Sequence, residues 1–173
     1  MSVQGVRPRV VYNSGNNEWY TPPEYIKAAV EVMGGIDLDP ASNELANTVV
    51  GAAKFYTPQE DGLMHPWWGR VWLNPPYSQP LIAKFCEKLI GHVLLGDVSE
   101  ACVLVNNATE TEWFQNLARH ASAICYPRGR VRFWSPSGSK ASNPLQGQAV
   151  IYMGPRADRF CEVFSRFGFV VKP

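Results

Sequence analysis

Several features that mark common protein classes are missing from this sequence of 173 residues. No apolar run reaches the length of a membrane-spanning helix, and the opening residues, MSVQGVRPRV, contain no apolar signal segment. Only 18% of the residues are charged and the formal net charge is +1, so the chain as a whole is not a polycation. These absences predict a cytoplasmic protein that is neither secreted nor held in a membrane.

Patterns typical of metal sites and disulfide frameworks are missing as well. The four cysteines are far apart, each lies among apolar residues, and no C-x-x-C pair occurs. The three histidines also have no spacing typical of metal ligands. We therefore predict no metal and no disulfide. We interpret the cysteines as small core residues in a reducing compartment; they are Cys86, Cys102, Cys125 and Cys161.

What the sequence does contain is enough apolar material for one core. Hydrophobic residues make up 46% of the chain, and no internal repeat or low-complexity block is present. Residues 1–17 are polar and end in the Gly/Asn-rich stretch NSGNN, which predicts a flexible arm. We expect residues 18–173 to form a single domain.

Segments with helical and with strand-like patterns alternate along the chain. Helices are predicted in residues 21–35, 78–94, 109–120 and 156–167, and strands in 36–38, 70–73, 101–105, 122–126, 129–134, 148–153 and 168–171. Thr21, Ser78 and Thr109 are the expected helix caps. Residues 41–69 give no clear pattern. The alternation predicts an α/β fold with a largely parallel sheet and helices on both faces.

Two of the predicted strands end in a polar residue followed by proline, at Asp39-Pro40 and Asn74-Pro75. Ligands of such sheets bind beyond the carboxyl ends of the strands. In NPPY, the Asn74 side-chain carbonyl and the Pro75 backbone carbonyl offer two acceptors for an –NH₂ group, and Tyr77 offers a ring face. This pattern predicts a pocket for the exocyclic amine of an aromatic base. It contains no strong base or nucleophile, so the chemistry needs an activated partner such as a sulfonium methyl donor.

The motifs EWYTPPEYI, DLDPAS, DGL and GRVWLNPPYS follow one another in this order. Together with PRGRVRFW, this set resembles the phage-type DNA N-6-adenine methyltransferase (Dam) family over about residues 18–153. The resemblance implies a Rossmann-like fold dependent on S-adenosylmethionine, with a mostly parallel sheet and an antiparallel strand near the C-terminus. It also implies site-specific methylation of adenine N6 in double-stranded DNA, by a phage or prophage protein in the bacterial host cell. Such enzymes are associated with restriction–modification.

The resemblance assigns roles to individual residues. Asn74, Pro75, Pro76 and Tyr77 are implied to hold an adenine flipped out of the duplex, so that N6 attacks the methyl group directly and in line. The expected cofactor contacts are Tyr20, Thr21, Pro22, Asp37, Asp39, Pro40, Ala41, Ser42, Asp61, Gly62 and Leu63. Asp37 is in this set because residues two apart on a strand face the same side. The glycine-rich turn common after the first strand is missing, and DPAS stands in its place.

DNA contacts are expected from basic residues near the end of the match. These are Arg128, Arg130, Arg132 and Lys140, in or next to a Gly/Ser-rich loop that is the expected DNA-reading element. The chain leaves little room for a separate target-recognition domain, and we expect a monomer or weak dimer. A solvated basic surface is the alternative interpretation of the same arginines.

Other interpretations of the motifs also stay open at this point. NPPY is also compatible with a loop that ends a strand, Asp39 with a helix cap, and Asp61-Gly62 with an ordinary turn. Two rival functions remain as well. One is a methyltransferase for another amine, such as cytosine N4, an RNA base or a protein glutamine. The other is a non-catalytic DNA-binding homologue, which would bind no S-adenosylmethionine in calorimetry.

Overall fold

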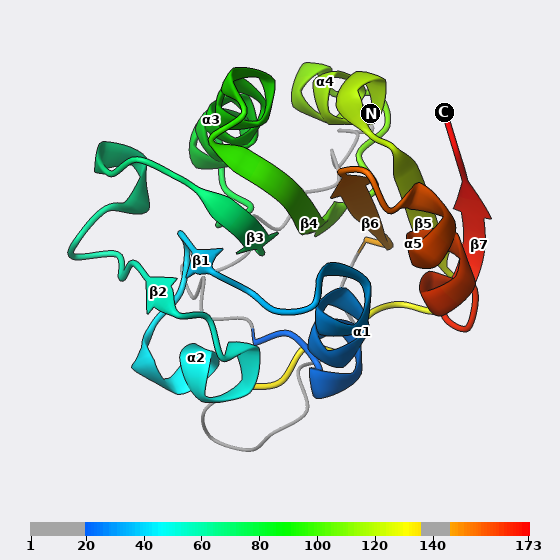
Figure 1. Ribbon diagram of the computed structural model, residues 1–173, viewed down its shortest axis with the longest axis horizontal. Coiled ribbons are helices and arrows are strands. Elements are labelled where there is room, and N and C mark those ends of the chain that lie inside the picture. The colour runs from blue at the N-terminus through cyan, green and yellow to red at the C-terminus, as the bar shows by residue number, and fades with distance from the viewer. Residues whose placement is uncertain (1–19, 136–145) are drawn as a thin grey trace, which may run out of the picture.

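A computed structural model describes residues 20–135 and 146–173, and all structural statements below concern these residues. One seven-stranded sheet has the order β2-β1-β3-β4-β6-β5-β7 (Figure 1). The strands are β1 (Leu38–Asp39), β2 (Lys54–Phe55), β3 (Gly69–Leu73), β4 (Val98–Asn106), β5 (Ala123–Pro127), β6 (Gln148–Met153) and β7 (Gly168–Val171). The helices are α1 (Pro23–Met33), α2 (Glu44–Val50), α3 (Leu81–Leu95), α4 (Glu112–His120), α5 (Ala157–Phe164) and the short 3₁₀ helix η1 (Gly62–Met64).

The sheet has a parallel half and an antiparallel half. β2, β1, β3 and β4 pair in parallel. β6 lies between β4 and β5 and runs against both, and β7 runs against β5 at the edge. The predicted α/β fold is confirmed. Five strands run in one direction, as a mostly parallel sheet requires, and two strands, β6 and β7, run against them where a single antiparallel strand was expected.

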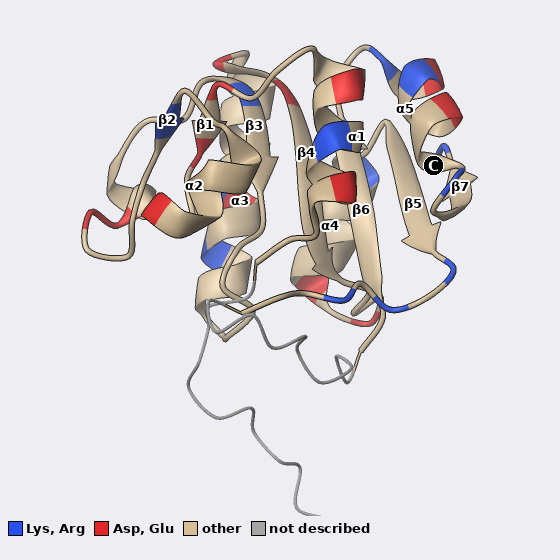
Figure 2. Cartoon of the chain, turned by 90° about the horizontal axis from the view of Figure 1, so that it is seen from below, with Lys and Arg blue, Asp and Glu red and all other residues tan. Residues whose placement is uncertain are grey.

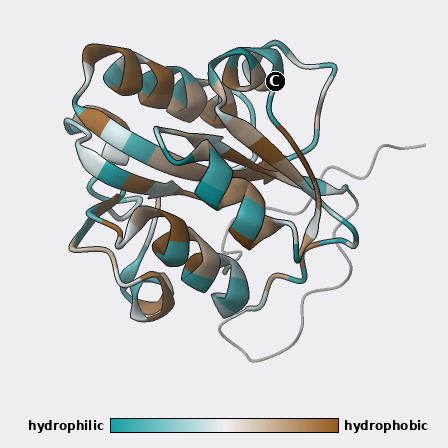
Figure 3. Cartoon of the chain, turned by 45° about the vertical axis from the view of Figure 1, so that its right-hand side comes forward, coloured by the Kyte–Doolittle hydropathy of each residue, from teal (hydrophilic) through white to brown (hydrophobic). Residues whose placement is uncertain are grey.

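Helices cover both faces of the sheet, as expected. In Figure 1, α3 and α4 lie on one side and α1, α2 and α5 on the other. Successive strand residues point to opposite faces, so Trp72 packs in the core under α1 and α5 whereas Val71 and Leu73 pack in the core under α3 and α4. Figure 3 shows hydrophobic and hydrophilic bands alternating along the helices, typical of helices with one buried face.

The three predicted helix caps are wrong. α1 has Pro22 at its N-cap position and no side-chain cap, and α3 has Pro80 there instead of Ser78. α4 is capped by Thr111, whose Oγ1 accepts from the backbone N–H of Phe114 at 3.3 Å, and not by Thr109. Thr21 does not cap α1 because its hydroxyl contacts a side chain far away in the sequence, as described below.

Residues 41–69 contain the elements that the sequence pattern missed. α2 begins after Asn43, whose Oδ1 accepts from Ala46 N–H at 2.9 Å, and ends at Gly51 in the left-handed conformation with φ 66°. β2 has only two residues. Elements this short do not complete enough turns or alternations to show a hydrophobic period.

Residues 129–134 do not form the predicted strand. One isolated bridge, between Tyr20 and Trp134, is the only strand-like pairing of these residues in the described part of the chain. Residues 1–17 and Lys140 lie outside the described residues, so the predictions made for them stay predictions. Among the residues that the structure describes, no helix is long and apolar enough to cross a membrane, and no cluster of potential metal ligands occurs.

Candidate active site

The predicted site residues meet at one edge of the sheet. β1 ends at Asp39 and the neighbouring parallel strand β3 leads into Asn74. β4 ends at Asn106, where β6 begins, because Asn106 and Gln148 are aligned in the register. We call this the carboxyl edge. In a parallel sheet it is the edge where ligands bind, so the topology alone places the two polar-Pro motifs at a candidate site.

The side-chain amide of Asn74 is held at both ends. Its Nδ2 donates to Thr21 Oγ1 at 3.3 Å, and its Oδ1 accepts from the Tyr77 hydroxyl at 3.0 Å. Thr21 is 6% exposed, so its hydroxyl is a buried partner. These two contacts anchor both ends of the amide before any ligand is bound.

Tyr77 is anchored through its hydroxyl group. The hydroxyl also lies 3.2 Å from the backbone carbonyl of Leu104, and burial raises the pKa of Tyr77 well above its ordinary value. The ring meets the ring of Phe133 edge-on, with centroids 6.4 Å apart and an interplanar angle of 76°. The phenol therefore stays neutral and acts as a donor inside the protein, and Phe133 is a neighbour that the sequence did not predict.

A segment from each end of the domain meets beside Asn74. Tyr20 and Trp134 exchange two backbone hydrogen bonds of 3.1 Å, and their rings lie 4.8 Å apart. Trp134 Nε1 donates to the Thr21 carbonyl at 3.2 Å. The predicted cofactor segment around Thr21 is therefore joined to the predicted DNA segment after β5, and both contact the NPPY motif.

Asp39 is a buried carboxyl group with no ion pair to any described residue. It is 3% exposed and accepts one hydrogen bond, from Ala41 N–H at 3.2 Å. Burial raises its pKa to about 7, although the Ala41 bond and the nearby Ser42 act in the opposite direction. Ser42 Oγ is itself buried, and among the described residues no hydrogen bond to it of good geometry is found. The DPAS motif thus presents a carboxyl and a hydroxyl whose bonding capacity is not filled by the residues that the structure describes.

The DGL and DPAS motifs touch each other. A Cβ on Gly62 would lie 1.9 Å from the Pro40 carbonyl oxygen, so only glycine permits this approach. The carbonyl of Gly62 accepts from the buried Trp67 Nε1 at 2.8 Å. Asp61 has φ 52° and its Oδ1 accepts from Leu63 N–H at 3.1 Å. Its carboxylate caps this turn, which is the alternative interpretation that the sequence had left open.

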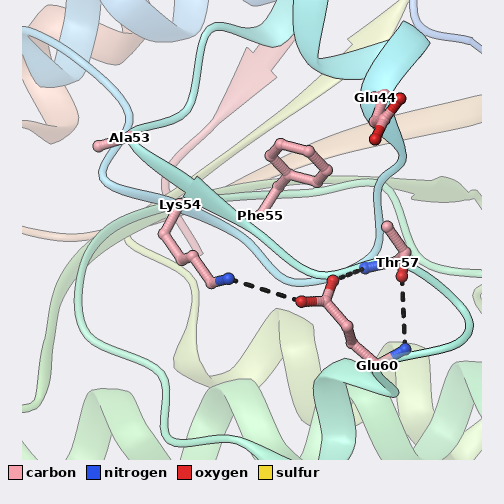
Figure 4. A pocket seen from close by; sticks show the side chains of 6 residues that line it. All are labelled: Glu44, Ala53, Lys54, Phe55, Thr57 and Glu60. Atoms are coloured by element: carbon pink, nitrogen blue, oxygen red, sulfur yellow. Dashed lines mark hydrogen bonds and ion pairs between the residues drawn. The ribbon is translucent and has the colours of Figure 1, made fainter.

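A hollow of about 350 Å³ lies next to DPAS, where the sequence pattern had indicated nothing (Figure 4). It follows β2, and Tyr56 connects it to the site, because the backbone of Tyr56 bonds to both Asp39 and Ser42. The Glu60 carboxylate accepts from Thr57 N–H at 2.9 Å and pairs with Lys54 Nζ at 3.6 Å. The lining residues are Glu44, Ala53, Lys54, Phe55, Thr57 and Glu60. These residues lie within 41–69, where the sequence showed no clear pattern. Their place beside the site becomes visible only through the pairing of β2 with β1.

Asp37 does not belong to this group. Its carboxylate accepts three hydrogen bonds from Arg70, from the backbone N–H, Nε and Nη2, each at 2.8 Å. These bonds lower the pKa of Asp37, and the pair lies at the amino end of β3, away from Asn74. The expectation that Asp37 and Asp39 share one site is corrected, because Asp37 forms a structural ion pair with Arg70.

The three arginines lie on an extended segment after β5. Arg128, Arg130 and Arg132 are exposed, whereas Val131 and Phe133 between and beside them are buried. Figure 2 shows blue bands on this part of the chain, at the edge toward which the arrows of β4 and β5 point. The predicted basic surface is therefore next to the carboxyl edge.

A family model described as DNA N-6-adenine-methyltransferase (Dam) matches residues 11–164. The chain belongs to this family. The match confirms the family that the sequence motifs predicted.

Two curated proteins of the Dam family are similar in sequence, and both bear the name DNA N-6-adenine-methyltransferase. The one from Escherichia phage T1 is 36% identical over 111 residues, which are 62% of this chain and 43% of that protein. The one from Haemophilus phage HP1 is 32% identical over 148 residues, 83% of this chain and 82% of that protein. This chain therefore spans less than half of the first relative's length and most of the second's.

One solved structure is also similar to this Dam-family chain. It is a crystal structure of a class I S-adenosylmethionine-dependent methyltransferase from Listeria monocytogenes, with a TM-score of 0.45 and 12% identity. The match covers 82% of this chain and 62% of that one.

Proposed function

We propose that this chain transfers a methyl group from S-adenosylmethionine to N6 of adenine in double-stranded DNA, at the carboxyl edge of the sheet. The observation that carries the proposal is the position of Asn74 at this edge, where Thr21 and Tyr77 anchor both ends of its amide. An amide carbonyl next to a proline backbone carbonyl suits an amino group with two N–H donors.

The residues around DPAS fit the cofactor. S-adenosylmethionine carries an ammonium group, and the buried Asp39 carboxyl group lacks a cationic partner among the described residues. Ser42 Oγ is a second buried group that can bond to the methionine part. Pro40, Ala41, Gly62 and Leu63 are proposed to line the same site, and the hollow along β2 extends it. When bound, the cofactor supplies an electrophilic methyl group.

The proposed role of NPPY is to hold the target amine. A carbonyl oxygen has two lone pairs, so Asn74 Oδ1 keeps the Tyr77 hydroxyl bond and accepts an N6 proton as well. Hydrogen bonds from both N6 protons, to Asn74 and to the Pro75 carbonyl, favour a more tetrahedral nitrogen and stabilise the positive charge that grows on it. Pro76 keeps the backbone open and Tyr77 borders the base. The protonated amine is strongly acidic, so no general base is required.

The test of the function is to incubate unmethylated double-stranded DNA with the protein and S-adenosylmethionine. Nucleoside analysis and modification-aware sequencing then identify the product. We expect N6-methyladenine in a defined sequence context. N4-methylcytosine alone would keep the chemistry and overturn the substrate. If the protein does not bind the cofactor in calorimetry and does not methylate DNA, it is a non-catalytic homologue.

Thr21 is proposed to act through Asn74 as well as near the cofactor. Thr21→Val has nearly the same shape but no acceptor for Asn74 Nδ2, so the amide loses one of its two anchors. We expect kcat to fall about three- to tenfold, the range for one neutral hydrogen bond. Thr21→Ser keeps the acceptor and should restore kcat. Equal rates for the valine and serine variants would show that the contact does not orient Asn74.

The arginines are proposed to contact phosphates on either side of the target base. Arg132→Gln should weaken DNA binding and lower the slope of log K against log salt by about 1, because one counterion fewer is released. Arg119→Gln is the matched control, since Arg119 is exposed near the C-terminal end of α4. Fluorescence titrations at four salt concentrations measure the slope. An unchanged slope for Arg132→Gln would remove this arginine from the interface.

We propose further that residues 18–173 act as one methyltransferase domain. The family match over most of the chain supports this. We propose a monomer or weak dimer that acts in the cytoplasm of the bacterial host, which is where the two phage relatives would meet DNA. A part in restriction–modification stays a prediction.

A further inference from the structure

Gln148 is a buried polar residue that no motif had singled out. It begins β6 and is 3% exposed, at the carboxyl edge beside the end of β4. Its Nε2 donates to Asn106 Oδ1 at 3.2 Å and to the Gln146 carbonyl at 2.8 Å. Its Oε1 accepts from the backbone N–H of Val131 at 3.0 Å. One side-chain amide therefore joins the end of β4, the start of β6 and the segment after β5.

That segment, residues 128–135, is called the arginine segment below. It is not a strand, although exposed arginines alternate in it with buried Val131 and Phe133. Backbone hydrogen bonds hold both ends of the segment. At one end the N–H of Arg128 donates to the Phe167 carbonyl at 2.9 Å, and at the other end Trp134 bonds to Tyr20. Val131, midway between these bonds, is held by a side chain. The bond to Gln148 thus replaces the strand partner that the middle of the segment does not have.

The register of the arginine segment matters because its residues alternate. A slip by one residue would turn Phe133 away from the core and turn arginines inward, where an unpaired charge is costly. Phe133 packs edge-on against Tyr77, and Trp134 donates to the Thr21 carbonyl. Fixing Val131 therefore sets both the outward direction of the arginines and the contacts of Phe133 with the NPPY motif.

The orientation of the Gln148 amide is determined by its neighbours. Asn106 Oδ1 and the Gln146 carbonyl are both acceptors, so they take the two N–H groups and leave the oxygen toward Val131. Methionine has a similar length but offers neither the donors nor a good acceptor. The site is thus built for an amide, in a place where an apolar side chain would leave several polar groups unsatisfied.

We propose that Gln148 is a positioning residue that fixes the register of the arginine segment, so that its arginines face the DNA and Phe133 supports Tyr77. This proposal rests on the proposed function, because only a DNA methyltransferase needs these arginines to face DNA and Tyr77 to border the target base. It adds a residue that touches neither cofactor nor base and acts through Val131.

The experiment compares Gln148→Met with wild type in three measurements on the full chain. Hydrogen exchange should be slow at the Val131 amide in wild type and at least about tenfold faster in the variant. Affinity for a DNA duplex should fall about tenfold, with a salt slope lower by about 1 to 2. Calorimetry should give an unchanged Kd for S-adenosylmethionine, because DPAS lies at β1, on the other side of β3. Gln115→Met on α4 is the matched control, since that exposed glutamine also donates to a backbone carbonyl.

Each outcome bears on the proposal. Fast exchange of Val131 in wild type would overturn it even if the variant failed to fold. Faster exchange with unchanged DNA affinity and slope would overturn the link to DNA. Loss of cofactor binding together with DNA binding would indicate a general structural role instead. These readouts do not need turnover, so an inactive wild type would count against the proposed function and leave the Gln148 result interpretable.

Discussion

Asn74→Ala is expected to lower the rate of methyl transfer by about three orders of magnitude, more than any other single substitution in the site. The alanine removes the fixed acceptor for N6 and also the bonds to Thr21 and Tyr77. Asn74→Asp keeps an acceptor at the same place and should retain measurable turnover. Single-turnover assays at saturating DNA and S-adenosylmethionine measure the chemical step for each variant.

The control for this prediction separates chemistry from folding. Both Asn74 variants should keep the wild-type circular dichroism and a Kd for S-adenosylmethionine close to that of wild type, since the DPAS motif, with Asp39 and Ser42, follows a different strand, β1. Asn116→Ala on α4 is the matched control, because that asparagine contacts Arg119 away from the NPPY motif. Normal turnover by Asn74→Ala would refute the assignment of NPPY to the target amine.

Asp39→Asn is expected to stabilise the ligand-free protein and at the same time to weaken cofactor binding. The folded pKa of Asp39 is about 7, against an ordinary value of 3.8, because burial disfavours the charged form. Between these two values the folded state binds more protons than the unfolded state, so the free energy of unfolding falls as pH rises from about 4 to 7. Above pH 7 the charged Asp39 costs about 4 kcal/mol relative to a neutral side chain.

The measurement is thermal unfolding at pH 5 and pH 8, with and without S-adenosylmethionine. Without cofactor, Asp39→Asn should have a higher Tm than wild type at pH 8 and a similar one at pH 5. With cofactor, wild type should gain more than the variant, and its affinity should fall below pH 7 as Asp39 becomes protonated.

The control for Asp39 is Asp158, a carboxyl group whose pKa is shifted in the opposite direction. Asp158 is exposed and Lys172 lowers its pKa, so its small contribution is lost as pH falls and Asp158→Asn should not raise the Tm at pH 8. An Asp39→Asn protein no more stable than wild type at pH 8 would mean that the carboxyl group is solvated. Unchanged cofactor affinity would remove Asp39 from the binding site.

The chemistry of the site was more predictable than its contacts. NPPY and DPAS could be placed at strand ends because a proline after a polar residue stops a strand, and parallel strands end at one edge. Thr21 was misinterpreted as a helix cap because its hydroxyl is used 53 residues away, at Asn74. Asp37 was misplaced because strand alternation gives a side chain's direction and says nothing of a partner such as Arg70, 33 residues away.

The sequence by itself determined the α/β class, the main strands and helices, the family, and the residues that carry the proposed chemistry. These follow from local periodicity and from motifs whose residues are close in the sequence. The tertiary structure alone decided that two strands rather than one are antiparallel, and it alone revealed the hollow beyond β2, the partners of Asn74, and the contact between Gln148 and Val131. Each of these features depends on hydrogen bonds or burial between segments that are distant in the sequence. The stabilising free energy of such contacts depends on where the partner residue lies in the fold, and no local sequence pattern contains that information.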